Sequence, residues 1–276
     1  MQTAEKVIYP TKETKGRVKI PLYLPFAKGR QLYITIEIGE GLVLYQYSPV
    51  RVKEGDANMQ NTELENLIKT RRSIRAFQDK PVPEELLVKA VETATWAPNG
   101  GNAQNWRFFI ILDRKLIRAV ADTIKNQMLT MITWPEMANA GPGGARLRNP
   151  QPGGALDTAP ALIVVTSVRS SNPMVDAMAK RGKTDPLAQE MYDGLQIVAG
   201  WAQSTSAFVA YLMLVLHQMG LGSLWMTGPL HAKAEIEKVL KLPAGLDLVT
   251  LVPVGYPAES PTKDRKPVSE VCKVIK

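Results

Sequence analysis

Three arginines and a serine fall within five consecutive residues, Arg71-Arg72-Ser73-Ile74-Arg75. A guanidinium group keeps its charge at ordinary pH and presents forked N–H donors that match the oxygens of a phosphate. The cluster could therefore hold a phosphate dianion. Charge clusters also occur as solvated basic turns, and the spacing alone leaves both interpretations open.

The overall charge of the chain is strongly positive, with a formal net charge of +8 at pH 7. Such a charge suits a nucleic acid, an anionic membrane surface or a phosphorylated ligand. The sequence has no zinc-finger spacing, no aromatic RNA-binding signature and no long basic run. Besides the arginines at 71–75, a second short basic cluster contains Lys263, Arg265 and Lys266. Two compact clusters favour a phosphate pocket over an extended nucleic-acid footprint.

Cysteine and histidine are too scarce for most metal chemistry. Cys272 is the only cysteine, and His217 and His231 are the only histidines. One cysteine excludes a disulfide within the chain and a cysteine-based zinc or iron–sulfur site. We expect no metal site, a packed core or interface position for His217, and a surface position near a helix start for His231.

Hydrophobic spacing, together with residues typical of helix ends, predicts the helices and strands around the arginine cluster. Thr62 and Glu65 form a capping box that predicts a helix ending near Thr70, directly before the cluster. Pro83 opens a second helix that should run to Trp96. The remaining segments predict strands at 108–112, 161–166 and 248–254 and a helix at 116–131.

Two segments of unusual composition leave alternatives open. The nearly uncharged stretch from Gln189 to Met219 predicts one long helix that is buried on all sides, in the domain core or at a subunit interface. Polar residues at 203–206 interrupt it, so we expect no membrane span. Residues 134–157 are rich in glycine and proline, which indicates either a surface loop or a mobile lid.

The N-terminal residues differ in pattern from the rest of the chain. Residues 17–52 alternate in short β-rich runs with a turn at 39–41, which predicts a small hairpin module, and 51–61 is polar enough for a linker. We therefore divide the chain into a β-rich extension, 1–58, and a main domain, 59–276. The first ten residues do not have the pattern of a secretory signal, so a cytoplasmic location is expected.

Several motifs along the main domain resemble those of a known family in the same order. They are RRSIRAF at 71–77 with PVPEEL at 81–86, APNGGNAQNW at 97–106, GLGSLWMTG at 220–228, PVGYP at 253–257 and KDRKP at 263–267. From about residue 60 to the end, the chain is similar to the nitroreductase-like FMN-dependent flavoproteins. It differs from the common pattern at Asn99, where the family often has serine, and at Asn105, where it often has proline.

The resemblance implies an α+β fold, with a mostly antiparallel sheet flanked by helices, in an intertwined homodimer that binds two FMN molecules at its interface. The FMN phosphate and ribityl chain would lie against Arg71, Arg72, Ser73 and Arg75, with Lys263 and Arg265 closing the pocket. The partner subunit would contribute Pro98, Asn99, Gly100 and Asn102, with Gln104 nearby. One face of the flavin would meet Trp225, Met226, Thr227 and Gly228, with Thr227 close to N5.

The resemblance further implies that NAD(P)H reduces the flavin and that a nitroaromatic, quinone or similar acceptor then takes its place, in a ping-pong cycle. Two other functions stay open. The sequence from Leu251 to Pro257 is similar to the iodotyrosine deiodinase branch, which implies reductive dehalogenation, although the Tyr-Glu-Lys lid of that branch cannot be placed in 134–157. The third function is flavin binding or processing without nicotinamide turnover.

Overall fold

The computed structural model describes residues 32–38, 41–47, 63–139, 154–168 and 172–275 of the 276 residues. The chain forms two compact units, 1–60 and 61–276, and each is treated by itself. In the first unit, strands β1 (Leu32–Ile38) and β2 (Gly41–Tyr47) pair antiparallel, with Leu32 opposite Tyr47. The expected strand near 17–24 and the threonine of the capping box lie outside the described residues.

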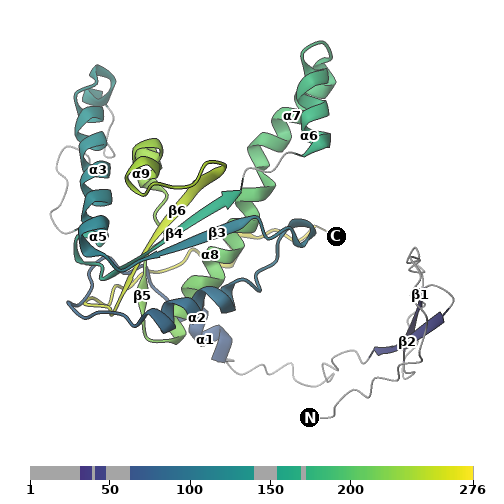
Figure 1. Cartoon of the computed structure of the whole chain (residues 1–276), viewed down its shortest axis with the longest axis horizontal. Coiled ribbons are helices and arrows are strands. Elements are labelled where there is room, and N and C mark those ends of the chain that lie inside the picture. Colours follow the sequence, from purple (N-terminus) through teal and green to yellow (C-terminus); the bar gives the residue numbers. More distant parts are fainter. Residues whose placement is uncertain (1–31, 39–40, 48–62, 140–153, 169–171, 276) are drawn as a thin grey trace. The chain divides into compact units, whose positions relative to one another are not determined.

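The second unit is built on a four-stranded antiparallel sheet in the order β3-β4-β6-β5 (Figure 1). Three strands match the predictions: β3 (Trp106–Ile111), β4 (Ala161–Val168) and β6 (Leu246–Gly255). The sequence did not reveal β5, because its two residues, Gly222–Ser223, are too few to show any alternation.

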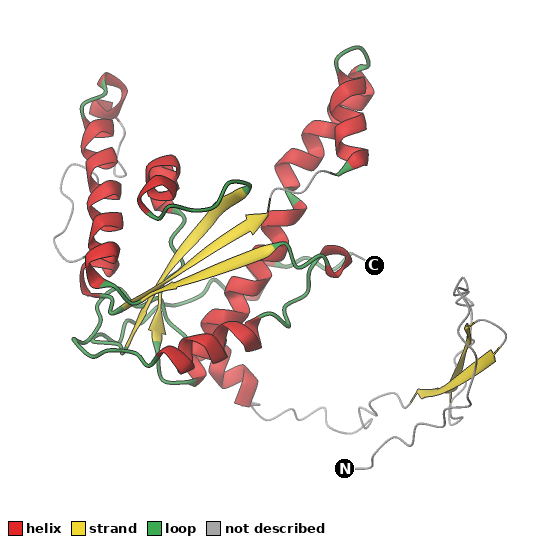
Figure 2. Ribbon diagram, viewed as in Figure 1, coloured by secondary structure: helices red, strands yellow, loops and turns green. Residues whose placement is uncertain are grey.

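Helices cover both faces of this sheet, because its central strands are apolar on both sides. Along β4, Ala161, Ile163 and Val165 face one core cluster, whereas Leu162 and Val164 face the other. The first cluster is closed by α2 (Glu84–Ala94) and α8 (Gly200–Gln218). The second is closed by α3 (Arg114–Ile132) and α9 (Lys233–Val239), as Figure 2 shows. The predicted α+β fold, with helices flanking an antiparallel sheet, is confirmed.

The helices on either side of β3 begin at residues that stabilise a helix N-terminus. Helix α1 spans Glu63–Thr70 and ends directly before the arginine cluster. In α2 two glutamates occupy the first turn, where they interact favourably with the helix dipole. Asp113 caps α3 by accepting a hydrogen bond from the backbone N–H of Lys115 at 2.8 Å.

The shorter described elements are η1 (Gly100–Asn102), η2 (Pro135–Asn139), α5 (Ala155–Thr158), η3 (Gly228–Ala232) and α10 (Val268–Val271).

The prediction of one long buried helix from Gln189 to Met219 is wrong. The chain breaks at Ala199, where φ is 39°, into α7 (Pro186–Val198) and α8. Only α8 enters the core, and α7 pairs with α6 (Pro173–Gly182) in a hairpin that projects from the sheet (Figure 1). Three apolar side chains of α7 that were expected to be buried are exposed: Met191, Leu195 and Ile197.

The stretch Pro186–Gln218, which includes this break, is long and apolar enough to cross a membrane by length and composition alone, the one such stretch among the described residues. Its second half, α8, packs against the sheet of this domain. Core helices of globular domains meet the same two criteria, so the stretch is weak evidence for a membrane span.

Candidate functional site

The arginine segment lies along the edge of the sheet beside β5. Ser73 forms a parallel bridge with Ser223, and the backbone N–H of Ile74 donates to the Ser223 carbonyl at 3.0 Å. The Ile74 side chain is buried with Phe77, Ala155 and Ala159. This anchoring fixes the backbone on both sides of Ser73 and so determines where the neighbouring arginines can point.

Gly222 is the residue that allows this close approach. A Cβ atom at position 222 would lie 2.8 to 3.0 Å from three side-chain atoms of Ile74, closer than real Cβ contacts. The arginine segment could not then keep its present distance from β5. We therefore expect Gly222 to be required for the geometry of the site.

Gly222→Ala is expected to destabilise the protein by about 1–3 kcal/mol, the usual cost of an overpacked core position. Urea unfolding followed by circular dichroism would measure this loss. Gly194→Ala is the matched control, because Gly194 lies within α7 and a Cβ atom at this position would meet open space. That substitution should instead raise stability by up to about 1 kcal/mol. Equal stability of the two variants would contradict the assigned role of Gly222.

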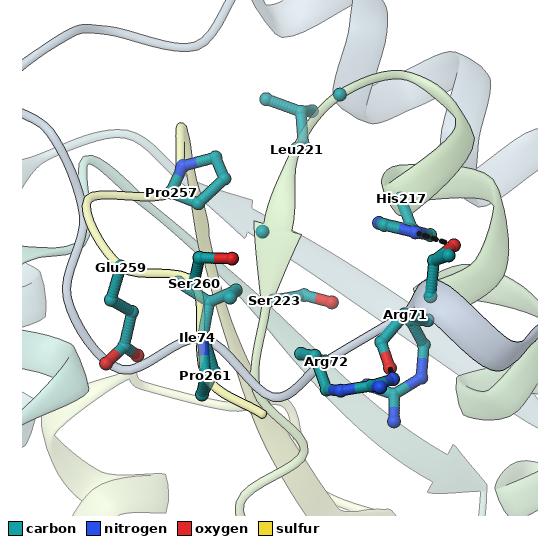
Figure 3. Close-up of a pocket in the computed structure, with 13 residues that line it drawn as sticks. Arg71, Arg72, Ile74, His217, Leu221, Ser223, Pro257, Glu259, Ser260 and Pro261 are labelled. Carbon is teal, nitrogen blue, oxygen red and sulfur yellow. Dashed lines mark hydrogen bonds between the residues drawn. The ribbon is translucent and has the colours of Figure 1, made fainter. Parts of the chain in front are cut away.

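A cavity of about 220 Å³ opens beside the anchored segment (Figure 3). Three segments that are distant in sequence meet at this cavity. They contribute Thr70, Arg71, Arg72 and Ile74 from the first segment, His217 and 220–223 from the end of α8 and β5, and Pro257 and Glu259–Pro261 from the third. Arg71 and Arg72 both line the cavity and are partly buried there.

One atom of the Arg71 guanidinium is buried and unsatisfied. This atom, Nη1, is shielded from solvent and has no hydrogen-bond partner in the part of the chain that the structure describes. Burial lowers the pKa of Arg71, and the positive charges of Arg265 and Arg72 lower it further. Among the described residues, none of these three arginines forms an ion pair with a carboxylate. A partly buried cation that lacks a counter-charge and lies among like charges is suited to bind an anion.

The carboxylate that lines the cavity is engaged with the backbone. Glu259 accepts hydrogen bonds from the backbone N–H groups of Arg75 and Ala76, the latter at 3.2 Å. Arg72 directs Nη1 to the carbonyl oxygens of Lys69 and Arg71, at 2.5 and 2.9 Å. Glu259 therefore holds the arginine segment in place, and the guanidinium of Arg71 is left for a ligand.

The predicted phosphate-binding residues do not all lie at this cavity. Arg71 and Arg72 line it, and Ser73 is anchored at its edge through Ser223. Arg265 is exposed, but it is close enough for its charge to lower the pKa of Arg71. Arg75 and Lys263 are exposed and are not among the lining residues. The sequence could not distinguish these positions, because all of them are basic residues in short clusters.

His217 belongs to the site, although the sequence suggested only a packed position. It is half-buried and lines the cavity, and its Nε2 lies 3.0 Å from Oγ1 of Thr70. Burial lowers its pKa, and the charges of Arg71 and Arg72 lower it further. Its place in the last turn of α8, three residues before Gly220, was the available signal.

The loop predicted to reach a partner's flavin lies at a different cavity. Asn99 accepts a hydrogen bond from the backbone N–H of Gln104 at 3.0 Å, and the N–H of Gly100 donates to Ser204 at 3.2 Å. Asn102 and Gln104 have positive φ angles of 52° and 47°. Asn99, Gly100 and Gln104 line a cavity of about 990 Å³ with parts of α6, α7 and α8, whereas Pro98 and Asn102 are exposed beside it. No residue that the structure describes lines both cavities.

The third predicted group follows β5. Met226 donates its backbone N–H to the Leu251 carbonyl at 3.0 Å and accepts from the Thr250 hydroxyl at 2.8 Å. Trp225 packs against the α2–α8 core cluster. Thr227 and Gly228 are exposed where η3 begins. The fixed backbone at Met226 thus holds an exposed turn directly after it.

A model of the nitroreductase family matches residues 68–256, which is most of the second unit and more than half of the chain. The chain belongs to the nitroreductase family. This membership confirms the resemblance that the motifs suggested. The matched range includes the arginine segment, the loop at 98–104 and the turn at 225–228, and it ends before Lys263 and Arg265.

Relatives in this family differ in the reactions their names describe. A Methanothermobacter thermautotrophicus protein provisionally named NADH dehydrogenase/NAD(P)H nitroreductase is 28% identical over 76% of this chain and 85% of its own length. Iodotyrosine deiodinase from Thermotoga neapolitana is 30% identical over 75% of this chain and 95% of its own length.

Two solved structures share the fold over nearly their whole length. A BluB-like flavoprotein from Clostridium difficile 630 has a TM-score of 0.67 and 28% identity, covering 78% of this chain and 100% of that one. An oxidised iodotyrosine deiodinase bound to FMN and 3-iodo-L-tyrosine has a TM-score of 0.55 and 28% identity, covering 77% and 97%.

Proposed function

We propose that this chain is an FMN-dependent oxidoreductase that works as a homodimer and passes electrons from NAD(P)H to a small electron-poor acceptor. The observation that carries the proposal is the buried Nη1 of Arg71, which lies near Arg72 and Arg265 and has neither a hydrogen-bond partner nor a neutralising carboxylate among the described residues. The terminal phosphate of FMN has the charge and the oxygen acceptors that this arrangement lacks.

The proposed roles follow from where the side chains lie. Arg71 and Arg72 would hold the phosphate inside the cavity, and Ser73 and Arg265 would contribute at its edge. Arg75 and Lys263, both exposed, would add charge around the entrance. The turn formed by Trp225, Met226, Thr227 and Gly228 would support the flavin ring. Bound FMN supplies the hydride chemistry, and these residues bind and orient it.

A homodimer is part of the proposal because the two groups of residues predicted to contact FMN lie at different cavities of one chain. The arginines line one cavity and the loop at 98–104 lines another, with no residue in common. A second copy could bring its loop to the flavin held by the first. Large apolar side chains on the surface also favour a partner, with Trp96 and Ile197 each 85% exposed.

NADH or NADPH is the proposed reductant, and a nitroaromatic or quinone is the proposed class of acceptor. Relatives named NAD(P)H nitroreductase support this choice. The sequence has no Gly-x-Gly-x-x-Gly turn after a strand, so a dinucleotide would dock briefly over the flavin and leave before the acceptor enters. This order of events is a ping-pong cycle.

Reductive dehalogenation is the second candidate. The observation that favours it is the 30% identity with the Thermotoga neapolitana deiodinase across 95% of that protein's length. Under this alternative the acceptor would be a halogenated aromatic amino acid. Both candidates use the same phosphate-binding residues and differ in the acceptor.

An anaerobic absorbance titration separates these functions. The purified protein, loaded with FMN, is titrated with NADH and with NADPH, and acceptors are then added one at a time. Bleaching by nicotinamide that a nitroaromatic or quinone reverses is the expected result. Bleaching by dithionite alone, reversed by 3-iodotyrosine, would favour dehalogenation. A flavin that dithionite alone bleaches and no acceptor reoxidises would overturn both candidates and favour flavin binding or processing without nicotinamide turnover.

A further inference from the structure

We propose that His217 is a further binding residue of the phosphate cavity, and that it takes up one proton from solvent when a phosphate-bearing ligand enters. The inference rests on the proposed FMN site and adds a residue to it. It starts from the position of His217, which lines the same 220 Å³ cavity as Arg71 and Arg72. Figure 3 shows its ring on the same side of the cavity as Arg71 and Arg72.

The hydrogen bonds of Thr70 determine which ring nitrogen of His217 carries the hydrogen. The Thr70 hydroxyl donates to the carbonyl oxygen of Asn66 at 2.7 Å. A hydroxyl has one hydrogen, so Oγ1 of Thr70 acts as the acceptor toward Nε2 of His217, 3.0 Å away. We therefore assign the hydrogen of neutral His217 to Nε2, which leaves the lone pair on Nδ1.

The free protein favours the bare lone pair on Nδ1, whereas a bound phosphate would disfavour it. In the free protein, burial and the charges of Arg71 and Arg72 keep the imidazole neutral, because they lower its pKa below the ordinary value. A phosphate dianion in the cavity would reverse the local field. It would oppose a bare lone pair and favour an N–H on Nδ1, which makes the imidazole a cation that can donate to the anion.

The other ionisable groups around α8 do not cancel this effect. Glu259, across the cavity, is bonded to the backbone N–H groups of Arg75 and Ala76. Helix α1 presents Glu63 and an ion pair between Lys69 and Glu65. Strands β4 and β5 and helix η1, which also contact α8, have no titratable side chain. Helix α2 has four charged residues, all exposed: Glu84, Glu85, Lys89 and Glu92.

The sign of the resulting pH dependence is fixed. The free-state pKa of His217 lies below its ordinary value, and the liganded pKa lies above the free one. The contribution of His217 to ligand affinity is therefore highest on the acid side and falls as the pH rises from the free-state pKa to the liganded pKa. Each unit between the two pKa values is worth about a tenfold change in affinity.

Calorimetric titration of FMN into the flavin-free protein tests the inference. Titrations at pH 7 in two buffers of different ionisation enthalpy give the number of protons taken up per FMN bound. We expect the wild-type protein to take up roughly one proton more than His217→Gln, because one imidazole is removed. The FMN phosphate titrates near pH 6, and its own contribution is common to both proteins.

Two controls isolate the effect. His231→Gln removes the other histidine, which is exposed in η3 and bonded to the Gly228 carbonyl, and it should take up protons as the wild type does. Riboflavin lacks the phosphate, so its binding should show no difference between the wild type and His217→Gln. Equal proton uptake with FMN in the wild type and His217→Gln would overturn the inference and leave the FMN site intact.

Magnetic resonance of the wild-type protein keeps the test independent of the variant's folding. The chain has two histidines, and the His231→Gln spectrum assigns the ring signals of His217. At pH 7 these signals should change from a neutral to a protonated ring when FMN saturates the protein. A ring that stays neutral would overturn the inference, and failure of FMN to bind would overturn it together with the proposed function.

Discussion

Arg71→Ala is expected to weaken FMN binding about a hundredfold, because charge-assisted hydrogen bonds contribute about 1.5–3 kcal/mol and this guanidinium has no other partner. The same change removes a charge that partial burial, and then the charges of Arg265 and Arg72, already disfavour. The flavin-free variant should therefore be at least as stable as the flavin-free wild type. Quenching of flavin fluorescence measures the affinity, and thermal unfolding measures the stability.

Two further variants make the Arg71 test specific. Arg118→Ala removes an exposed arginine of α3 that does not line the cavity, and it should leave FMN affinity unchanged. Arg71→Lys should be intermediate, because an ammonium keeps the charge but loses the forked donors. FMN affinity of Arg71→Ala within about threefold of the wild type, a change below 1 kcal/mol, would remove Arg71 from the site.

Phe208→Ala is expected to have the largest effect on stability, a loss of about 3–5 kcal/mol, the usual cost of deleting a buried aromatic ring. Phe208 is fully buried in α8. Its ring stacks on that of Phe108 with centroids 4.0 Å apart, and the Trp106 ring lies 5.5 Å away. These three rings join the central helix to strand β3 (Trp106–Ile111), which directly follows the loop at 98–104.

Urea unfolding measures this loss at one fixed protein concentration, since the stability of the proposed homodimer would depend on concentration. Tyr211→Ala is the matched control on the same helix. Tyr211 is 43% exposed, so its truncation should cost no more than about 1 kcal/mol. If the two variants lose the same stability, the core does not depend on the ring cluster as described.

The sequence predicted most of the sheet and its flanking helices because their signals are local. β4 (Ala161–Val168) and β6 (Leu246–Gly255) are largely apolar runs, Pro83 marks the start of α2, and the apolar spacing of 116–131 predicted most of α3. The break at Ala199 could not be predicted, because alanine favours a helix and its positive φ depends on the tertiary structure. The two residues of β5 are recognised by their partners and not by any pattern.

The candidate site was predictable by residue type and not by orientation. The spacing of Arg71, Arg72 and Arg75 allowed an anion site but gave no reason to separate the partly buried Arg71 from the exposed Arg75. His217 was missed because a histidine in an apolar helix usually packs in the core, and its approach to Thr70 joins residues 147 positions apart. Which arginine faces the cavity depends on the bridge between Ser73 and Ser223.

The most direct test of the central claim compares the affinities of FMN and riboflavin for the flavin-free wild-type protein at one pH and salt concentration. The two ligands share the isoalloxazine ring and the ribityl chain, and only FMN has the phosphate that Arg71 and Arg72 would hold. The account predicts that FMN binds at least about a hundredfold more tightly, and that added salt weakens this preference. Equal affinity for the two flavins would contradict a phosphate site at the arginine cavity.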